Sequence, residues 1–234
     1  MEYLRVVEAQ TPLYEYNVTT STEHAEALQE LIESEKPKKY AFEWHELIAT
    51  PFRYHLPVGV KYGARFRPPG SKTNILYASE ELRTALYEHA FHFCKFRIGM
   101  NPKTLDKSAE RSVFGFNLIT EPTIEDVSNR TDILKIMDKF DYKCSHEFIE
   151  ANPLLKVIRY PSCRDTKAGH NIAVREIKQC EKDINSEKRI SFVFDPKGWK
   201  ISWIEPAIEI NCKKEFAYLF QAKIQKKKSK PHRV

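Results

Sequence analysis

The chain has 234 residues, 41% of them hydrophobic and 30% charged, a composition that suits a folded domain rather than a disordered or fibrous protein. No apolar run approaches the ~18 residues that a membrane span needs, and the N-terminal segment carries charges where a signal peptide is apolar, so we expect a soluble cytoplasmic protein. The five cysteines are widely spaced and lack a C-x-x-C pair, which predicts reduced thiols and neither a disulfide framework nor a zinc site.

The net charge of +6 resides in the C-terminal segment. Residues 223–234 hold five lysines and one arginine and no acid, so the rest of the chain is formally neutral. We predict one domain over residues 1–225, followed by a basic tail over 226–234. A solvated tail is the plainer interpretation, and an electrostatic contact with an anionic partner is left open.

Helix signals concentrate in the first half of the chain. Thr20 and Glu23 form a capping-box pattern before apolar residues at helical spacing, and Pro37 is expected to end that helix. A second, short helix is predicted over residues 41–49, and it should stop before Pro51.

The clearest helix follows Tyr77. Ser79 is its expected N-cap, because a serine hydroxyl can accept a hydrogen bond from the first free backbone N–H groups. Its apolar stripe consists of Leu82, Leu86, Phe93 and Phe96. A further helix is expected over residues 132–140.

The second half of the chain is predicted to be mostly strand. The candidate strands cover residues 112–119, 155–161, 171–177, 189–194, 199–204 and 215–224. Asp195-Pro196-Lys197-Gly198 predicts a turn between two of them. Helices early and strands late favour an α+β fold over regular βαβ alternation.

Arg65 lies on a loop whose backbone we expect to be constrained by its glycine and proline residues. Gly63 and Gly70 permit backbone torsions that other residues avoid and allow a ligand to come close. Pro68 and Pro69 restrict the segment between them. This loop is a candidate binding element, and an ordinary turn with a surface arginine is the alternative.

Glu88 and His92 are four residues apart and share one face of the predicted helix, beside its apolar stripe. A polar side chain at that border can face a cleft, and an exposed i,i+4 pair is the alternative. His89 falls near the middle of the stripe and is expected to be a core histidine with a hydrogen-bond partner. A metal site built on His89 and His92 would lack further ligands.

A strand is expected to end at Tyr160, and Pro161, Ser162 and Arg164 follow on its exit loop. Ser162 could donate a hydrogen bond to a phosphate or a carboxamide. No Gly-x-Ser-x-Gly pattern surrounds it, so Ser162 is not interpreted as an acyl-transfer nucleophile. Plain turn chemistry is the alternative for this loop.

Together these segments resemble the RES domain family, named for an arginine, a glutamate and a serine in that order. The resemblance rests on "GARFRPPG", "ILYASEELRTALYEHAFH", "YPSCR" and "GHN" and covers roughly residues 47–174. The family's motif positions fall on Gly63, Arg65, Phe66, Pro68 to Gly70, Tyr77, Ser79, Ala85, Glu88, His92, Pro161, Ser162 and Asn171. Two departures are Arg67, where many members carry a small polar residue, and the missing Asn-Pro after Asn171.

The resemblance implies a fold similar to that of ADP-ribosyltransferase toxins, with a split mixed sheet and NAD+ in the cleft. Characterised RES proteins are toxins of type II toxin–antitoxin systems that consume NAD+ by hydrolysis or phosphorolysis, and some transfer ADP-ribose to a protein. Their usual antitoxin is a Xre-type helix-turn-helix protein that covers the active site. NAD+ is the substrate, and no metal or other cofactor is implied.

The resemblance also implies roles for individual residues. Glu88 would stabilise the positive charge that develops on the ribose, Arg65 would hold the pyrophosphate or a ribose oxygen, and Tyr77 would stack on the nicotinamide or the sugar. These three are the predicted catalytic residues. The remaining predicted contacts to NAD+ come from Ser79, His92, Ser162 and Asn171.

Two other functions are kept as alternatives. The first is an ADP-ribosyltransferase that modifies one cellular protein through the same cleft. The second is a non-enzymatic nucleic-acid-binding module, which is disfavoured because the body has no charge excess and no RNP, KH or zinc-finger pattern. Whether Arg65 or Arg67 contacts the substrate, and whether the protein forms a homodimer, are left open.

Overall fold

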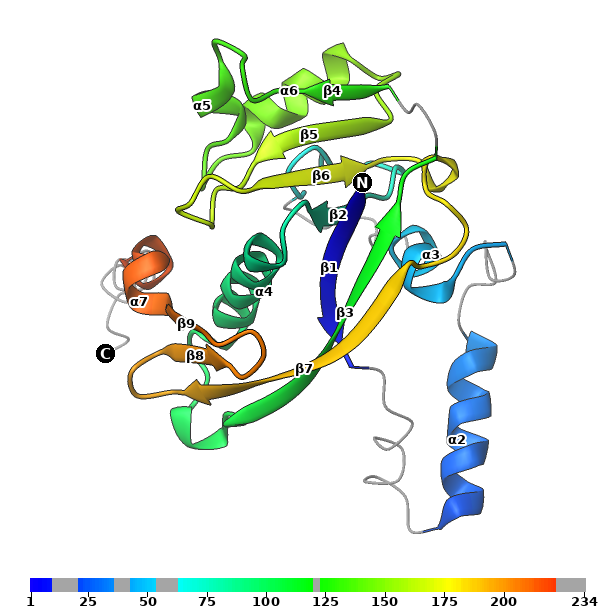
Figure 1. The fold of residues 1–234 in the computed structure, drawn as a ribbon, viewed down its shortest axis with the longest axis vertical. Helices are drawn as coiled ribbons and strands as arrows, with labels where there is room; N and C mark the ends of the chain where they lie inside the picture. The colour runs from blue at the N-terminus through cyan, green and yellow to red at the C-terminus, as the bar shows by residue number, and fades with distance from the viewer. Residues whose placement is uncertain (10–20, 36–42, 54–62, 120–122, 222–234) are drawn as a thin grey trace, which may run out of the picture.

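The computed structural model describes residues 1–9, 21–35, 43–53, 63–119 and 123–221, which form one mixed sheet with helices on both faces (Figure 1). The strand order across the sheet is β4-β5-β6-β2-β1-β3-β7-β8-β9, and only β4 and β5 pair in parallel. The strands are β1 (Glu2–Glu8), β2 (Leu76–Ser79), β3 (Ser108–Asn117), β4 (Ile124–Asp126), β5 (Val157–Pro161), β6 (His170–Val174), β7 (Ser186–Asp195), β8 (Lys200–Trp203) and β9 (Ile208–Asn211). The α+β fold and the mixed sheet are confirmed.

The sheet nearly separates into two halves between β1 and β2. A single register pair, Leu4 with Ser79, joins these strands, whereas β1 and β3 stay paired along the whole of β1. In Figure 1, β2, β6, β5 and β4 lie across the upper part of the molecule, and β1, β3 and β7 run downward from it. The short junction leaves room for side chains at the point where the two halves meet.

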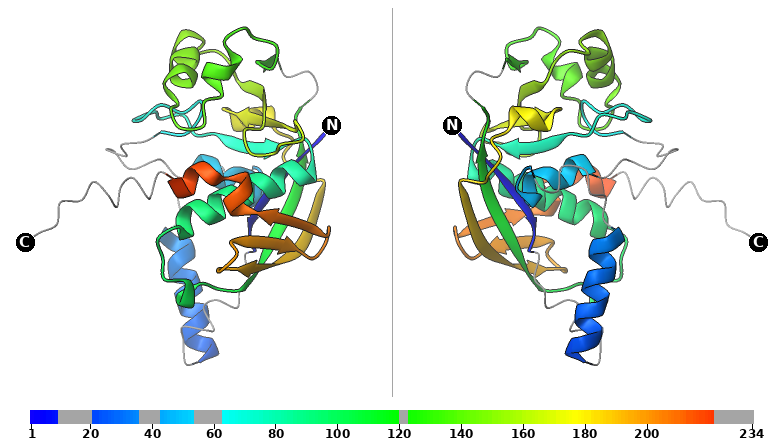
Figure 2. Two further views of the ribbon diagram at one scale, coloured as in Figure 1. Left: turned by 90° about the vertical axis from the view of Figure 1, so that its left-hand side faces the viewer. Right: turned by 90° about the vertical axis from the view of Figure 1, so that its right-hand side faces the viewer.

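Helices cover both faces of the central strands. The α-helices are α2 (Thr22–Glu35), α3 (Glu46–Arg53), α4 (Leu82–Arg97), α5 (Ile133–Ile136), α6 (Lys143–Ala151) and α7 (Cys212–Glu215), with short 3-10 turns η1 (Pro102–Thr104) and η2 (Ile177–Gln179). Leu4 and Val6 of β1 pack with the α4 core, and Tyr3 and Val7 pack with the α3 core, as alternation along a strand requires. Figure 2 shows α2 projecting away from this body. Among the described helices, none has the length and apolar character that crossing a bilayer demands.

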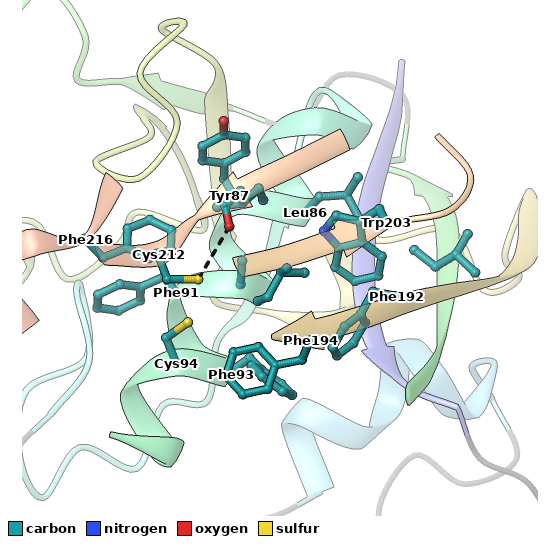
Figure 3. Packing of buried hydrophobic residues seen from close by; sticks show 14 of the residues in the cluster. Leu86, Tyr87, Phe91, Phe93, Cys94, Phe192, Phe194, Trp203, Cys212 and Phe216 are labelled. Atoms are coloured by element: carbon teal, nitrogen blue, oxygen red, sulfur yellow. Dashed lines mark hydrogen bonds between the residues drawn. The ribbon is translucent and has the colours of Figure 1, made fainter. Parts of the chain in front are cut away.

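Aromatic side chains fix α4 against the half of the sheet that contains β7 and β8 (Figure 3). The Phe93 ring stands edge-on to Phe192 and Phe194, with centroids 5.0 and 5.1 Å away, and Trp203 lies 4.8 Å from Phe192. Burying a phenyl side chain contributes roughly 1.5–3 kcal/mol, so this cluster holds the helix firmly. The side chains that face the cleft from α4 therefore start from a rigid element.

Three local predictions in the first half are wrong. Pro51 lies inside α3, because its missing N–H removes only one hydrogen bond from a short helix whose Leu47, Ile48 and Phe52 are buried. Ser79 ends β2 instead of capping α4, whose N-cap is Glu81. Phe96 was expected on the apolar stripe of α4, yet it is 71% exposed.

In the second half, the predicted strands are present except the last. Residues 217–221 are helical and follow α7, and the final strand is β9. The helix begins at residue 212 because the Asn211 side chain accepts a hydrogen bond from the Lys214 N–H. Of the predicted helix over 132–140 only α5 forms, and the elements β1, β2, β4, β9 and α6 were not predicted.

The turn at 195–198 is confirmed, since the Asp195 carboxylate accepts the N–H groups of Lys197 and Gly198, both at 2.9 Å. Helix α2 is also present, and the Ser21 hydroxyl accepts the His24 N–H at its start. The predicted cap at Thr20, the helix end at Pro37 and the tail over 226–234 lie outside the described residues.

Candidate active site

The candidate active site is a cleft of about 430 Å³ where the two halves of the sheet meet α4. Its size is in the range of pockets that hold small organic ligands. Side chains from β1, β2, β6, α4 and the loop that carries Arg65 line it. The predicted site residues in the lining are Arg65, Tyr77, Ser79, Glu88, His92 and Asn171.

The Glu88 carboxylate is held by neutral donors on one oxygen. Ser162 Oγ donates to Glu88 Oε1 at 2.7 Å, and Asn171 Nδ2 donates to the same oxygen at 2.8 Å. Glu88 Oε2 has no hydrogen-bond partner among the described residues. The carboxylate is therefore oriented through one oxygen while the other remains available in the cleft.

A second layer of contacts fixes those two donors. Ser79 Oγ donates to Asn171 Oδ1 at 2.6 Å, and the two residues sit opposite each other in the β2–β6 register. Ser162 Oγ accepts the N–H groups of Arg164 and Asp165, both at 3.1 Å. Because each donor is itself bonded, the orientation of the Glu88 side chain is set by strands far apart in sequence.

The loop after β5 is tied to the start of α4. Thr84 Oγ1 donates to the Asp165 carboxylate at 2.9 Å, and Arg83 forms an ion pair with the same group. Gly169 allows this close approach, because a Cβ atom there would lie 1.9 Å from Thr84 Oγ1. The contacts bring Ser162 within reach of Glu88.

The loop that carries Arg65 is a tight turn. The backbone N–H and C=O groups of Ala64 and Arg67 bond to each other at 2.8 and 2.9 Å, and Phe66 between them has a φ of 61° with its ring buried. A Cβ atom at Gly63 would come 2.1 Å from the Arg67 carbonyl, which explains the first glycine. The second, Gly70, has a φ of 76°. The expected constrained loop is present.

The Arg65 guanidinium is occupied by backbone carbonyls. Nη1 donates to the Ile136 carbonyl at 2.6 Å, and Nη2 donates to the Asp138 carbonyl at 2.8 Å. The guanidinium also lies over the Tyr142 ring, 4.9 Å from its centroid. These partners differ from the pyrophosphate contact that the resemblance implied. Arg67 is not in the lining and instead donates to Asn74 Oδ1 at 2.7 Å.

Tyr77 lies on β2 and presents its ring to the cleft. Its hydroxyl donates a short hydrogen bond to the Arg65 carbonyl, so the phenol braces the Arg65 loop. Burial raises the pKa of Tyr77 above its ordinary value, and the nearby Arg67 and Arg65 oppose that shift. Tyr77 is therefore a neutral hydrogen-bonding and stacking group.

The two histidines of α4 behave differently. His92 is exposed at the cleft, and among the described residues no hydrogen bond joins it to Glu88. His89 accepts a hydrogen bond from Arg111 Nε at 2.8 Å through Nε2, while its buried Nδ1 has no partner in the described part of the chain. His89 thus packs beside the aromatic core with one ring nitrogen bonded, as expected, but it is only half-buried and also borders the cleft.

Sequence reasoning missed two cations of the cleft. Arg5, on β1, lines it, and burial lowers the pKa of this guanidinium to about 10, which leaves it charged at neutral pH. Its signal was a single cation inside an apolar strand pattern. Arg164 was placed on the exit loop after Tyr160 without a predicted substrate contact, and it lines the cleft together with Glu88. The cleft therefore combines one carboxylate with several guanidiniums.

This arrangement suits a substrate that carries negative groups and develops positive charge near a carboxylate. In the described residues, no cluster of three or more histidine, cysteine or acidic side chains is placed to hold a metal ion.

The chain matches no curated protein. The model of the RES domain family matches residues 38–195, a stretch that spans more than half of the chain and contains the cleft residues from Arg65 to Asn171. The chain therefore belongs to the RES domain family, which is known in toxin-like proteins that act on NAD.

Proposed function

We propose that this protein is an enzyme that cleaves the bond between nicotinamide and ribose in NAD+. The observation that carries the proposal is Glu88, whose carboxylate is oriented through one oxygen by Ser162 and Asn171 and leaves the other oxygen available in the cleft. Membership of the RES domain family supports the choice of substrate.

The chemistry follows from the charge that develops in the reaction. Cleavage of a glycosidic bond passes through an oxocarbenium-like state, in which positive charge grows on the sugar. A fixed carboxylate stabilises that state more than the ground state, which is the requirement for catalysis. Glu88 Oε2 is the atom that performs this task. The leaving nicotinamide departs as a neutral molecule, so the leaving group needs no proton from the enzyme.

The other cleft residues position the substrate. Tyr77 offers an aromatic face on which a planar ring can stack, and His92 stands one turn after Glu88 at the opening. Ser79 acts indirectly, because its hydroxyl holds the Asn171 amide in the orientation that donates to Glu88. The bond-breaking step is completed when water or inorganic phosphate attacks the sugar.

We further propose that the protein acts in the cytoplasm as the toxin of a type II toxin–antitoxin pair. Depletion of NAD+ would arrest growth, and a Xre-type helix-turn-helix protein that covers the cleft would prevent it. Family membership supports this role. The test is growth after induction of the chain alone and together with a small helix-turn-helix protein encoded next to it.

The decisive experiment incubates the purified full-length chain with NAD+, with and without phosphate, and identifies the products by mass spectrometry. We expect free nicotinamide together with ADP-ribose or its phosphate ester. Intact NAD+ after prolonged incubation at high enzyme concentration would contradict the proposal. With NAD+ labelled in the adenylate part, label retained on a protein band would instead indicate ADP-ribosyl transfer.

A further inference from the structure

The guanidinium of Arg164 is buried and has no hydrogen-bond partner among the residues that the structure describes. The residue is 6% exposed, and its Nη1 atom is buried and unbonded. Within the described ranges, no carboxylate, carbonyl or hydroxyl accepts a hydrogen bond from its guanidinium. Removing a cation from water is unfavourable unless another group compensates, so a guanidinium in this state indicates a missing ligand.

Aromatic stacking holds this guanidinium in the wall of the cleft. Its Cζ atom lies 3.8 Å from the centroid of the Phe91 ring and 5.7 Å from that of Tyr218. Phe91 follows Glu88 by three residues on α4, so the two share one side of the helix. The Arg164 backbone N–H is also bonded to Ser162 Oγ, which donates to Glu88. Arg164 is thereby placed next to the carboxylate.

Two of the neighbouring charged groups are already committed, whereas Arg5 Nη1 is also buried without a partner among the described residues. Asp165, the adjacent acid, is bonded to Arg83 and Thr84. Arg65, the other buried arginine of the lining, donates to two backbone carbonyls. The lining contains three guanidiniums and a single carboxylate, so the cleft has an excess of positive charge for an anion to balance.

We propose that Arg164 binds a phosphate group of the substrate. The planar guanidinium, whose Cζ atom lies over the Phe91 ring, has N–H groups in a fork that fits phosphate oxygens. The inference rests on the proposed function and assigns to Arg164 the anion contact that the resemblance gave to Arg65. The phosphate group has two sources in this reaction: the diphosphate of NAD+ and free inorganic phosphate that attacks the sugar.

The test compares Arg164→Met with Arg97→Met. Methionine keeps an apolar stem against Phe91 and removes the charge. Arg97 is a matched control, because its guanidinium lies 3.7 Å from the centroid of Phe93 on the same helix but outside the cleft lining. Thermal unfolding checks that both variants are folded. A third variant, Arg164→Lys, keeps the charge but lacks the forked N–H groups, and it is expected to restore part of the binding.

Binding is measured by calorimetry with ADP, adenosine and inorganic phosphate as probes. We expect the unsubstituted protein to bind ADP more tightly than adenosine and Arg164→Met to bind ADP about 10- to 100-fold more weakly, because hydrogen bonds to charged groups contribute on this scale. Arg5 remains in the cleft of this variant, so some affinity should persist. Adenosine binding should not change.

Enzyme kinetics distinguish the two possible sources of the bound phosphate group. A higher KM for NAD+ in phosphate-free buffer assigns Arg164 to the diphosphate of NAD+. Loss of phosphate-dependent turnover and of phosphate binding, with ADP binding unchanged, assigns it to the attacking phosphate. The proposal is overturned if Arg164→Met matches Arg97→Met with every probe. That result would not affect the proposed cleavage of NAD+. Conversely, a protein that binds ADP through Arg164 but does not cleave NAD+ would contradict only the proposed function.

Discussion

Two consecutive residues of α4, Glu88 and His89, both border the cleft but have different neighbours. Glu88 faces the cleft, where Ser162 and Asn171 donate hydrogen bonds to one of its oxygens. His89 turns toward the aromatic core, where its ring lies edge-on to Trp203 with centroids 5.5 Å apart. Two adjacent positions of the helix thus differ: Glu88 is held by polar donors in the cleft, and the His89 ring packs against aromatic side chains.

The two residues are held in different ways, and we call the surroundings of Glu88 the cleft side of α4 and those of His89 the core side. The cleft side depends on hydrogen bonds from loops and strands that meet only in the folded chain, and each contributes about 1 kcal/mol. The core side depends on aromatic burial, which contributes several times more in total. Changes on the cleft side should therefore alter activity with little effect on stability, and changes on the core side should do the reverse.

The largest effect is expected from Glu88→Gln. Glutamine keeps an oxygen that can accept from Ser162 and Asn171, but it removes the charge that stabilises the transition state. Losing such a contact costs about 3–4 kcal/mol, so kcat for NAD+ cleavage should fall by at least about 100-fold. Glu88→Ala should lower it by a similar factor.

Thermal unfolding of the Glu88 variants is the control. Because Glu88 lies outside the aromatic core, both variants should unfold close to the temperature of the unsubstituted protein. A variant that retains full activity, or one that is unfolded, would remove Glu88 from the catalytic role.

Arg65→Met sharpens the comparison, because Arg65 lines the cleft but its guanidinium donates hydrogen bonds to backbone carbonyls of the protein. The substitution leaves the Ile136 and Asp138 carbonyls without their donor. Hydrogen bonds from a charged group contribute about 1.5–3 kcal/mol each, so we expect a loss of roughly 2–3 kcal/mol in the free energy of unfolding. Denaturant unfolding measures it. A fully stable variant that has lost NAD+ binding would mean that Arg65 acts on the substrate.

The fold class followed from the sequence because its signals are local. Alternating apolar residues predicted β5 to β8, and the apolar stripe predicted α4. The C-terminal helical segment was missed, since aromatic residues such as Phe216 fit a strand pattern as well as a buried helix. The three-dimensional neighbours decide between these two states, and a short window does not contain them.

The sequence indicated which residues could share a site, but it did not indicate the contacts that those residues make. Arg65, Tyr77 and Glu88 do meet in one cleft. The partners of Arg65 were not predictable, because the Ile136 and Asp138 carbonyls lie 71 and 73 positions away and carry no side-chain signature. For the same reason, the sequence did not show that Arg5 and Arg164 each keep a guanidinium nitrogen without a partner among the described residues.

The pH dependence of stability tests the core side of the comparison. Burial, reinforced by Arg111, lowers the pKa of His89 to about 3, whereas an unfolded histidine titrates near 6.5. Between these values the unfolded chain binds a proton that the folded chain does not, so stability falls as the pH drops below about 6.5. At pH 5 this contribution amounts to about 2 kcal/mol.

His89→Gln removes this titration and keeps an acceptor for Arg111. Its loss of stability between pH 7 and pH 5, measured by denaturant unfolding, should be smaller than that of the unsubstituted chain by about 2 kcal/mol. His24→Gln, on the exposed surface of α2, is the matched control and should behave like the unsubstituted chain. Equal losses in all three proteins would mean that His89 is protonated in the folded state.

The smallest effect is expected from Ser162→Ala. The change removes one of the two donors to Glu88 and the acceptor for the N–H groups of Arg164 and Asp165. Asn171 still holds the carboxylate, so we expect kcat to fall by only about tenfold, the equivalent of a single hydrogen bond. Ser202→Ala, on β8 and outside the cleft lining, should retain full activity.

The split between kcat and KM shows how Ser162 acts. If it only orients Glu88, kcat falls while KM for NAD+ stays near its original value, because the carboxylate acts on the transition state more than on the bound substrate. A rise in KM without a change in kcat would instead place the Ser162 hydroxyl on the substrate itself. In that case the hydrogen bond to Glu88 would have to be exchanged for a contact with the nucleotide during binding.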